Sequence, residues 1–563
     1  MSGLKSRIDA SQGRIPCDLV LLQARWFDVF SCSWRSGSLS IHDGVIVGVD
    51  APLPAHRSID LKGAAVVPGF IDAHVHIESS LMTPGAFERS TLPRGTTAAI
   101  CDPHEIANVV GLPGIEWFLA CAEKMRLDLR VMLSSCVPAS HLETNGAGSL
   151  TGRDLARFQN HRKVLGLAEM MNFPGVIHGD AEVISKLEQF SHQRIDGHSP
   201  LLRGQSLSSY LVGGPSSCHE CVFADEAAEK ISKGMSVWIR EGSVAHDLEN
   251  LAPLLKIETS TSLGFCTDDR NPLDIREQGH IDHLVREAIR QGIAPELAFR
   301  AASWSVARHY GLDKNDLHGN ARMGAIAPGY AANLIVLDDI VGIAIREVFQ
   351  RGVPTSELAW ERLPEHSFGG TVRVAALSEA DFSAPKGRVH IIDVLPGKIL
   401  TDRHVGNSDD PGVAQLTVIE RYGHGHRPAH GYLRGFGDAF RGAIASTVGH
   451  DSHNLIIVGT EARDMKVAAE ALTATGGGFC VVKNGAVLSQ LALPIGGLMT
   501  HESPERIHRK LTELKAAARN IGCELHEPFL QLAFLSLPVI PSLKLTNLGL
   551  VDVDRFEIIS LTC

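Results

Sequence analysis

Short apolar runs that end in a polar or ionisable residue recur through the first half of the chain. The residues at these ends follow one another at intervals of 21 to 33 residues: His76, His104, Cys136, Glu169, His198, His219, Glu241 and Asp268. Such an interval fits one β-strand, one helix and two loops, so eight units of this size predict an α/β fold built on a (β/α)8, TIM-like barrel. In that fold chemistry gathers at the carboxyl ends of the strands, where these residues lie.

The regions on either side of these units have a different pattern. Residues 17–60 contain short β-rich runs with Asp43-Gly44 between two of them, which is a hairpin signal, and residues 324–351 add strands that would complete the same small sheet. Strand patterns alternate with helical ones again after residue 376. The predicted organisation is an N-terminal part of a small β-domain (1–66), the barrel (67–323), the return strands (324–360), a linker (361–375) and a C-terminal α+β domain (376–563).

Composition disfavours nucleic-acid-binding, membrane-spanning and disulfide-rich proteins. The chain has 563 residues with 53 Lys and Arg against 64 Asp and Glu, and a net charge of −11 disfavours nucleic acid or an anionic membrane as the partner. No apolar run approaches the ~20 residues of a spanning helix. No apolar signal segment follows the first residues, so we expect a cytoplasmic protein. The 11 cysteines are irregularly spaced and do not indicate a disulfide framework.

The candidate chemistry begins at Asp72-Ala-His74-Val-His76. Side chains at i and i+2 of a strand share one face, so His74 and His76 are placed to chelate one divalent metal ion. A lone His-x-His fits two structural histidines equally well, but the later strand ends add Glu169, His198, His219 and Asp268. Four histidines and two carboxylates at one barrel mouth suffice for two metal ions, with one carboxylate free to bridge them.

The motifs around these residues resemble those of the amidohydrolase superfamily and, more closely, the bacterial adenine deaminase family. The resemblance covers nearly the whole chain. It is carried by Pro68-Gly-Phe-Ile-Asp-Ala-His-Val-His-Ile-Glu-Ser-Ser, Cys101-Asp-Pro-His-Glu-Ile-Ala-Asn-Val, Glu169-Met-Met-Asn, Arg240-Glu-Gly-Ser, Thr267-Asp-Asp-Arg, His450-Asp-Ser-His-Asn and Leu493-Pro-Ile-Gly-Gly-Leu-Met.

This resemblance implies hydrolytic deamination of adenine to hypoxanthine and ammonia, in which a metal-activated bridging hydroxide attacks C6 of the purine. It implies two divalent ions per chain, with Mn²⁺ as the first candidate and Fe²⁺ or Zn²⁺ as the others. One ion would be held by His74, His76 and Asp268, the other by His198 and His219, with Glu169 between them. The expected partner is a small purine, and the expected assembly is a homodimer.

Deamination also requires proton transfer to the ring and to the leaving amino group. Asp268 is the candidate for accepting the proton of the hydroxide, and Glu220 for passing one to N1, although Glu220 fits a role in orienting His219 equally well. Further candidates for substrate contact are His104, Arg240 and Glu241 at strand ends, which fit a structural role at the barrel rim equally well, and His450 and His453 in the C-terminal domain. The last two would close over the pocket or bind another metal ion.

Two positions depart from the family pattern. Cys218 stands where an aspartate is usual and Asn271 where a histidine is usual, and segment 199–217 is loosened. These departures leave open adenine or a close purine analogue as the substrate. The main alternative is a cyclic-amide hydrolase of the same superfamily, which would normally have a lysine in place of Glu169. A binding protein derived from such an enzyme would lack one of the six ligands, and a cytidine-type zinc deaminase would need the His76 and Cys218 motifs far closer in sequence.

Overall fold

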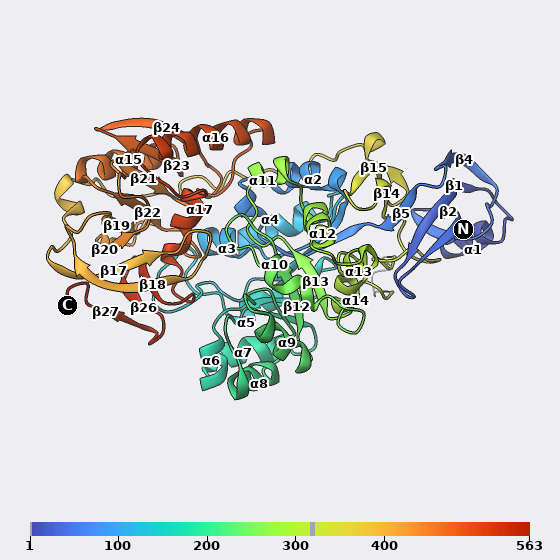
Figure 1. The fold of residues 1–563 in the computed structure, drawn as a ribbon, viewed down its shortest axis with the longest axis horizontal. Coiled ribbons are helices and arrows are strands. Elements are labelled where there is room, and N and C mark those ends of the chain that lie inside the picture. The colour runs from blue at the N-terminus through green and yellow to red at the C-terminus, as the bar shows by residue number, and fades with distance from the viewer. Residues whose placement is uncertain (1–2, 316–320) are drawn as a thin grey trace.

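The computed structural model describes residues 3–315 and 321–563, and its elements fall into three regions along the long axis (Figure 1). A β-rich region holds the N-terminus at one end, an α/β region lies in the centre, and the C-terminal residues form the other end. Within the described residues, no helix combines the length and the apolar character that crossing a bilayer requires.

One sheet of eight strands joins two distant parts of the chain. Its order is β16-β15-β14-β5-β1-β2-β3, with β4 paired to β1, and β14 runs antiparallel to β5. Sequence-distant segments therefore build one small β-region. The strands are β1 (Cys17–Asp28), β2 (Ser33–His42), β3 (Val45–Gly48), β4 (Ala55–Asp60), β5 (Ala65–Pro68), β14 (Leu334–Asp339), β15 (Ala344–Gln350) and β16 (Val353–Pro354).

The Asp43-Gly44 pair makes the tight turn between β2 and β3, as its sequence predicts. Asp43 has φ 51° and Gly44 has φ 70°, the positive values that a type I′ hairpin turn requires of both residues. The preceding helix α1 (Gly3–Ser11) is not expected from the pattern. Its Leu4 and Ile8 are 68% and 49% exposed, so its apolar residues do not form the buried stripe from which a helix is predicted.

Eight parallel strands form the centre, in a sheet of five (β10-β9-β8-β7-β6) and a sheet of three (β11-β12-β13). The two sheets approach each other at both ends, through a parallel bridge between Val75 and Asp268 and a 2.9 Å hydrogen bond from Ser216 N–H to the Ile195 carbonyl. The strands are β6 (Phe70–Val75), β7 (Thr96–Cys101), β8 (Asp128–Leu133), β9 (Val164–Met170), β10 (Arg194–Gly197), β11 (Ser217–Cys218), β12 (Ser236–Arg240) and β13 (Leu263–Cys266).

Helices cover these strands, so strands such as β7 and β8 are buried along their whole length. The helix expected at 279–291 is α12, whose apolar side chains Ile281, Leu284, Val285, Ala288 and Ile289 are buried. The principal helices are α2 (Pro84–Thr91), α3 (His104–Val110), α4 (Leu112–Ala122), α7 (Ala181–Gln189), α8 (Gly204–Val212), α9 (Ala224–Ser232), α11 (Pro272–Glu277), α12 (Ile281–Arg290), α13 (Pro295–Ala301) and α14 (Trp304–His309).

A second sheet of eight strands makes the C-terminal region, in the order β18-β17-β20-β19-β22-β21-β23-β24. A small sheet, β25-β26-β27, lies beside it. The elements are β17 (Arg388–Val394), β18 (Thr401–Asn407), β19 (Ala414–Ile419), β20 (Ala429–Arg434), β21 (Ala443–Ser446), β22 (Leu455–Gly459), α15 (Ala462–Ala474), β23 (Gly478–Lys483), β24 (Ala486–Ala492), α16 (Pro504–Asn520), α17 (Pro528–Ala533), β25 (Leu543–Thr546), β26 (Gly549–Asp552) and β27 (Glu557–Ile559).

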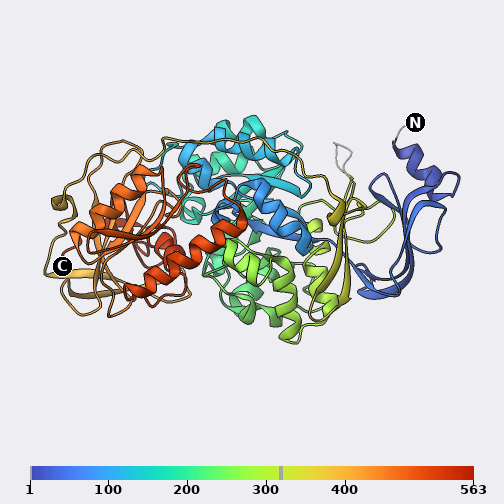
Figure 2. The same ribbon diagram turned by 90° about the horizontal axis from the view of Figure 1, so that it is seen from above.

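Residues 358–378 connect the β-rich region to the C-terminal sheet without helix or strand. Figure 2 shows this segment running along the central region. It is held there by Trp117 Nε1, which donates to the Pro364 carbonyl over 2.8 Å, and by an ion pair between Arg126 and Glu361. The connection is therefore packed against the central helices over part of its length.

Candidate metal centre

Six of the residues singled out in the sequence converge at the carboxyl ends of the central strands. They are His74 in β6, His76 directly after it, Glu169 in β9, His198 after β10, His219 after β11 and Asp268 after β13. Each is at most 5% exposed. We call them the six-residue cluster.

Four ligand atoms of this cluster form one tight group. The Nε2 atoms of His74 and His76 are 3.0 Å apart. Glu169 Oε1 lies 3.5 Å and 3.3 Å from these two nitrogens, and Asp268 Oδ1 lies 3.4 Å and 3.2 Å from them. Ligand atoms that share one metal ion at 2.0–2.2 Å lie about 3–3.5 Å from each other. The group therefore has the spacing of a metal site.

The second oxygen of Glu169 faces two other histidines. Glu169 Oε2 lies 2.7 Å from His198 Nδ1 and 3.3 Å from His219 Nε2. One carboxylate thus points one oxygen at each pair of imidazoles, which is the arrangement of a bridging ligand. His198 Nε2 is buried without a hydrogen-bond partner, so that ring has a free nitrogen for a further contact.

Neighbouring groups fix the orientation of these side chains. His76 Nδ1 lies 3.0 Å from the Asp102 carbonyl, which directs Nε2 toward the cluster. Asp72 accepts the backbone N–H groups of His74 and Thr267 and so joins β6 to β13. The backbone N–H of His198 donates to the Tyr210 hydroxyl, which itself donates to the Met170 carbonyl. The loosened segment 199–217 therefore still supplies a support for His198.

The pKa values of the cluster residues show that its carboxylates are stabilised by neighbouring positive charge. Burial alone would lower the pKa of His74, but the charge of Glu169 and the hydrogen bonds with Asp268 and Glu169 raise it to about 10. Burial alone would raise the pKa of Asp268, but hydrogen bonds with His74 and His76 hold it well below its usual range. The buried carboxylates are thus kept ionised by cationic neighbours, a role that bound metal ions fill in sites of this composition.

This donor set fits two divalent first-row metal ions. Imidazole nitrogens and carboxylate oxygens are the ligands that Mn²⁺, Fe²⁺ and Zn²⁺ share. The six side chains supply enough donors for two ions, and Glu169 has one oxygen facing each group of histidines. The close approach of the His74 and His76 nitrogens agrees with such occupancy.

Glu220 lies beside the cluster and is held by an arginine. Arg240 Nη1 donates to Glu220 Oε1 and, over 3.0 Å, to Asp268 Oδ2, while its Nε donates over 3.0 Å to Asp247. Glu220 Oε1 is also 3.4 Å from His219 Nε2. Asp268 within the cluster and Glu220 beside it, the two carboxylates considered for proton transfer, therefore share one guanidinium group.

A small cavity opens at the cluster and is roofed by the C-terminal region. Its volume is about 20 Å³, space for about one water molecule. The wall on the central side contains most of the cluster with Glu220, Asp269, Met171 and His104. The roof consists of side chains from the C-terminal region, which are Ile399, His450, Asp451, Phe534, Leu537 and Ile540. The site is thus built from two regions of the chain.

The remaining sequence candidates divide into two sets. His104 and His450 line the cavity, whereas Arg240, Glu241 and His453 do not. Arg240 is occupied by its three carboxylates, and Glu241 turns toward His246 at 2.8 Å. His453 is fully buried behind the wall. Contact of these three residues with a substrate stays a prediction.

Sequence reasoning missed the apolar roof and Asp451. Asp451 lies inside the His450-Asp-Ser-His-Asn motif, so its place was visible, but its chemistry was assigned to the histidines. Phe534 lies parallel to His450, with ring centroids 4.6 Å apart. Phe534, Leu537 and Ile540 belong to an apolar stretch that carries no local signal for a substrate pocket.

The two departures from the family pattern lie outside the cavity. Cys218 is buried, and Lys230 Nζ donates to its sulfur over 3.4 Å. Asn271 caps α11 by accepting the backbone N–H of Asp274. Neither residue lines the wall that a substrate would meet.

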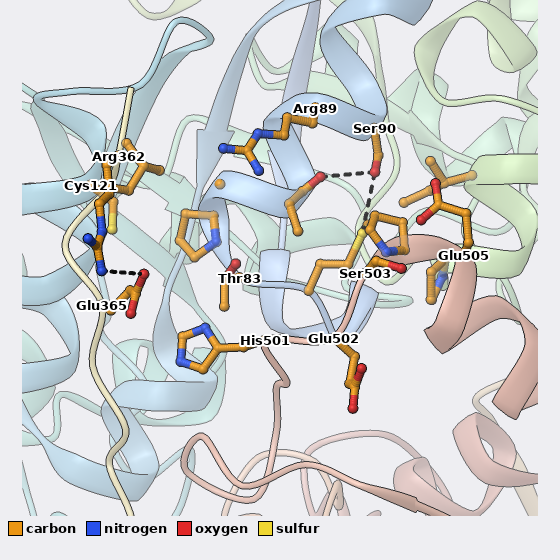
Figure 3. A pocket seen from close by; sticks show the side chains of 18 of the residues that line it. Thr83, Arg89, Ser90, Cys121, Arg362, Glu365, His501, Glu502, Ser503 and Glu505 are labelled. Carbon is orange, nitrogen blue, oxygen red and sulfur yellow. Dashed lines mark hydrogen bonds and ion pairs between the residues drawn. The ribbon is translucent and has the colours of Figure 1, made fainter. Parts of the chain in front are cut away.

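A much larger hollow, of about 800 Å³, lies away from the strand ends. It is bounded by α2, the connecting segment near residues 362–365 and the residues before α16 (Figure 3). Arg89, Arg362 and His501 are among its polar lining residues, while none of the sequence-predicted site residues lines it. The candidate chemistry therefore belongs to the smaller cavity.

Comparisons with known proteins identify the family of this chain. The model described as the adenine deaminase C-terminal domain matches residues 398–557, and that of the amidohydrolase family matches residues 65–366. The adenine deaminases of Sinorhizobium fredii (strain NBRC 101917 / NGR234) and Cereibacter sphaeroides (strain ATCC 17025 / ATH 2.4.3) are each 48% identical to the chain, over 99% of both sequences. A solved enamidase of the amidohydrolase superfamily is 16% identical, with a TM-score of 0.43 over 60% of this chain and 95% of its own. The resemblance found in the motifs is confirmed by the full-length relatives, and the chain belongs to the adenine deaminase family within the amidohydrolases.

Proposed function

We propose that the chain is a metal-dependent adenine deaminase, converting adenine and water to hypoxanthine and ammonia. The observation that carries this proposal is Glu169, whose two oxygens face different pairs of histidines. Full-length relatives named adenine deaminase support the choice of substrate. In this proposal the eight central strands form one (β/α)8 barrel over residues 67–323, and the six-residue cluster lies at its mouth.

The cluster would hold two divalent ions, Mn²⁺ first among the candidates. His74, His76 and Asp268 would hold one ion, His198 and His219 the other, and Glu169 would contact both. Bound divalent ions lower the pKa of water from 15.7 to about 7 and so supply a nucleophile at neutral pH. Proton transfer and binding of the base are carried out by side chains of the protein.

Two protons must move for each adenine converted. Water adds its oxygen to C6, the bond from C6 to the amino nitrogen breaks, N1 gains one proton and the departing amino group gains the other. Asp268 and Glu220 are the two carboxylates that line the cavity beside the cluster and share Arg240. Glu220 passes one proton of the water to N1, and Asp268 accepts the other and returns it to the leaving nitrogen as ammonia forms.

The C-terminal roof supplies the apolar surface that a planar base needs. Phe534, Leu537 and Ile540 face the cavity opposite the polar cluster. A purine with its C6 edge toward the cluster would place its ring faces against such side chains. Because the present cavity holds only about one water molecule, substrate entry requires the roof residues to shift.

The decisive experiment is ammonia release from adenine by purified full-length protein reconstituted with Mn²⁺, with hydantoin and dihydropyrimidine as competing substrates. We expect ammonia and hypoxanthine in equal amounts and no opening of the cyclic amides. Opening of a cyclic amide without ammonia from adenine would contradict the proposal and favour the alternative hydrolase. Glu169 in place of a lysine argues against that alternative.

A further inference from the structure

Five buried carboxylates between the six-residue cluster and the C-terminal region lack a strong cationic partner. Each is at most 7% exposed, and among residues 3–315 and 321–563 none of them lies within ion-pair distance of a lysine or arginine. Their only ion-pair neighbours there are His104 and His450. The five are Glu78, Asp102, Glu105, Asp269 and Asp451. Buried carboxylates are costly unless a cation or several hydrogen bonds compensate them.

The opposite side of the cluster shows how this chain compensates such charge elsewhere. Arg240 alone contacts Glu220, Asp268 and Asp247, all of them buried. Among the described residues, no lysine or arginine makes an ion pair with the five carboxylates on the side toward the C-terminal region. The carboxylates on that side accept hydrogen bonds from Ser79, Ser134 and the Ile106 backbone N–H instead.

Several polar atoms on this side are buried without a hydrogen-bond partner. These atoms are His104 Nε2, His450 Nε2, Asp451 Oδ2 and Glu105 Oε2. The four residues are between 0% and 2% exposed, so bulk water does not satisfy them. Buried nitrogens and oxygens without a partner are uncommon, and several on neighbouring residues indicate a ligand or ion beside them.

The geometry of three of these residues matches an ion site. Asp451 Oδ1 lies 3.6 Å from His104 Nε2 and 3.4 Å from His450 Nδ1, and the ligand atoms of the three residues lie within 4.8 Å of one another. Glu105 Oε1 is 3.6 Å from His450 Nδ1. These separations exceed those of the six-residue cluster slightly, so small side-chain shifts would bring the donors to a common ion.

Both halves of this group are held in place by their surroundings. His104 begins α3, and its Nδ1 lies 3.0 Å from Asp102 Oδ2. His450 follows β21, its backbone N–H donates to the Ala533 carbonyl over 3.0 Å, and its ring lies parallel to Phe534. The donors therefore come from two elements on opposite sides of the boundary between the central and C-terminal regions.

We propose that His104, His450 and Asp451 form a third divalent-cation site, with Glu105 at its edge. Two imidazoles and a carboxylate suit a first-row transition-metal ion such as Mn²⁺ or Zn²⁺ rather than Ca²⁺ or Mg²⁺. The ion would tie α3 to the loop after β21 and so hold the C-terminal roof over the cavity. This site goes beyond the proposed deamination and does not depend on it.

The test counts metal in full-length protein saturated with Mn²⁺ and then freed of unbound ion. We expect three Mn²⁺ per chain in the wild type and two in Asp451→Asn and in His450→Gln. His453→Gln is the matched control, because His453 Nε2 is also buried and unpartnered but His453 does not belong to this group. That variant should keep three.

Anomalous diffraction from wild-type crystals grown in Mn²⁺ locates the ion without relying on any variant. The expected third peak lies ~2.0–2.6 Å from donor atoms of His104, His450 and Asp451. Saturation of the wild type at two ions, a third peak elsewhere, or purine density at this point would overturn the proposal. Two ions together with ammonia release would contradict the third metal site and support the deaminase function. Three ions without ammonia release would support the third metal site and contradict the deaminase function.

Discussion

Arg240 Nη1 donates a hydrogen bond to Asp268 Oδ2 over 3.0 Å, and both side chains are buried. The same nitrogen contacts Glu220, so a single guanidinium group fixes the distance between the two carboxylates proposed to move protons. Arg240 is a sequence candidate for substrate contact, and in the structure its guanidinium group positions these two carboxylates.

Replacing Arg240 should therefore strongly lower the free energy of unfolding. Arg240→Gln leaves Glu220, Asp247 and Asp268 buried without their shared cation, and we expect a loss of about 3–5 kcal/mol in the free energy of unfolding. Urea unfolding of metal-loaded protein measures this. Arg290→Gln is the control, since its ion pair with Glu287 is exposed and should contribute less than about 1 kcal/mol. Equal stability of the two variants would contradict the role given to Arg240.

Glu169→Gln tests the bridge. The substitution keeps the shape of the side chain and removes the charge that both groups of histidines face, so Mn²⁺ affinity should fall at least about 10- to 100-fold and the metal count by one or more. Isothermal titration of the metal-free chain checks this. Glu241→Gln, at another strand end but turned toward His246, should bind Mn²⁺ as the wild type does. Undiminished metal binding by Glu169→Gln would remove Glu169 as the bridge.

Asp268→Asn separates metal binding from proton transfer. The amide oxygen still occupies the ligand position, but it does not accept a proton as a carboxylate does. We expect retained metal and a fall in kcat of about 10²–10⁴-fold. Metal content and turnover are measured on one sample, with the exposed Asp338→Asn as control. Full turnover by Asp268→Asn would exclude Asp268 as the proton acceptor.

The strand-end residues were predictable because the candidate site residues recur along the sequence at the same interval as the predicted strands. A polar residue that interrupts each apolar run marks the end of a strand, and parallel strands bring those ends together, so His76, Glu169 and Asp268 could be identified without coordinates. The roof could not. Asp451 and Phe534 reach the cavity only because the C-terminal region docks on the centre, and no periodic pattern in a sequence encodes the angle at which two regions meet.

The sequence also does not determine the directions in which the His450 and His453 side chains point. His450 and His453 are three residues apart, yet His450 lines the cavity and His453 is buried behind it. A β-strand or helix would have fixed their relative directions, but the loop after β21 does not follow either period. Spacing therefore located this motif, and only the structure shows which side chain faces the site.

A pH effect on stability should arise from Lys544. This lysine is buried in β25, its Nζ donates to the Ile399 carbonyl over 2.8 Å, and burial lowers its pKa from 10.5 to about 7. Between these pH values the unfolded chain binds more protons than the folded one, so the contribution of Lys544 to the free energy of unfolding rises with pH and is smallest below pH 7.

The lowered pKa costs the folded wild type roughly 4–5 kcal/mol at pH 7. Lys544→Met removes this cost but leaves the Ile399 carbonyl unpaired, which costs about 1–3 kcal/mol. We therefore expect the variant to be more stable than the wild type at pH 7 by about 2 kcal/mol, with the difference shrinking toward pH 10. Urea unfolding at pH 7, 8.5 and 10 measures the trend. Lys466→Met, which alters a partly exposed ion pair with Glu470, should show no such trend. A difference that grows with pH would have the wrong sign for this argument.

Tyr210 should act on the site without touching a substrate. Its hydroxyl accepts the His198 backbone N–H over 3.0 Å and donates to the Met170 carbonyl over 2.7 Å, so it ties the end of β9 to the segment after β10. Tyr210→Phe keeps the ring but leaves both backbone groups unpaired, and we expect a loss of about 1–3 kcal/mol in the free energy of unfolding. Because His198 is then less firmly placed, Mn²⁺ affinity should also fall by about 10-fold. Tyr330→Phe removes a hydroxyl whose contact with the Asp313 carbonyl is a long 3.5 Å, and it should change neither quantity appreciably. A loss of stability in Tyr210→Phe with unchanged Mn²⁺ affinity would make Tyr210 a structural residue and leave the position of His198 to its side-chain contact with Glu169.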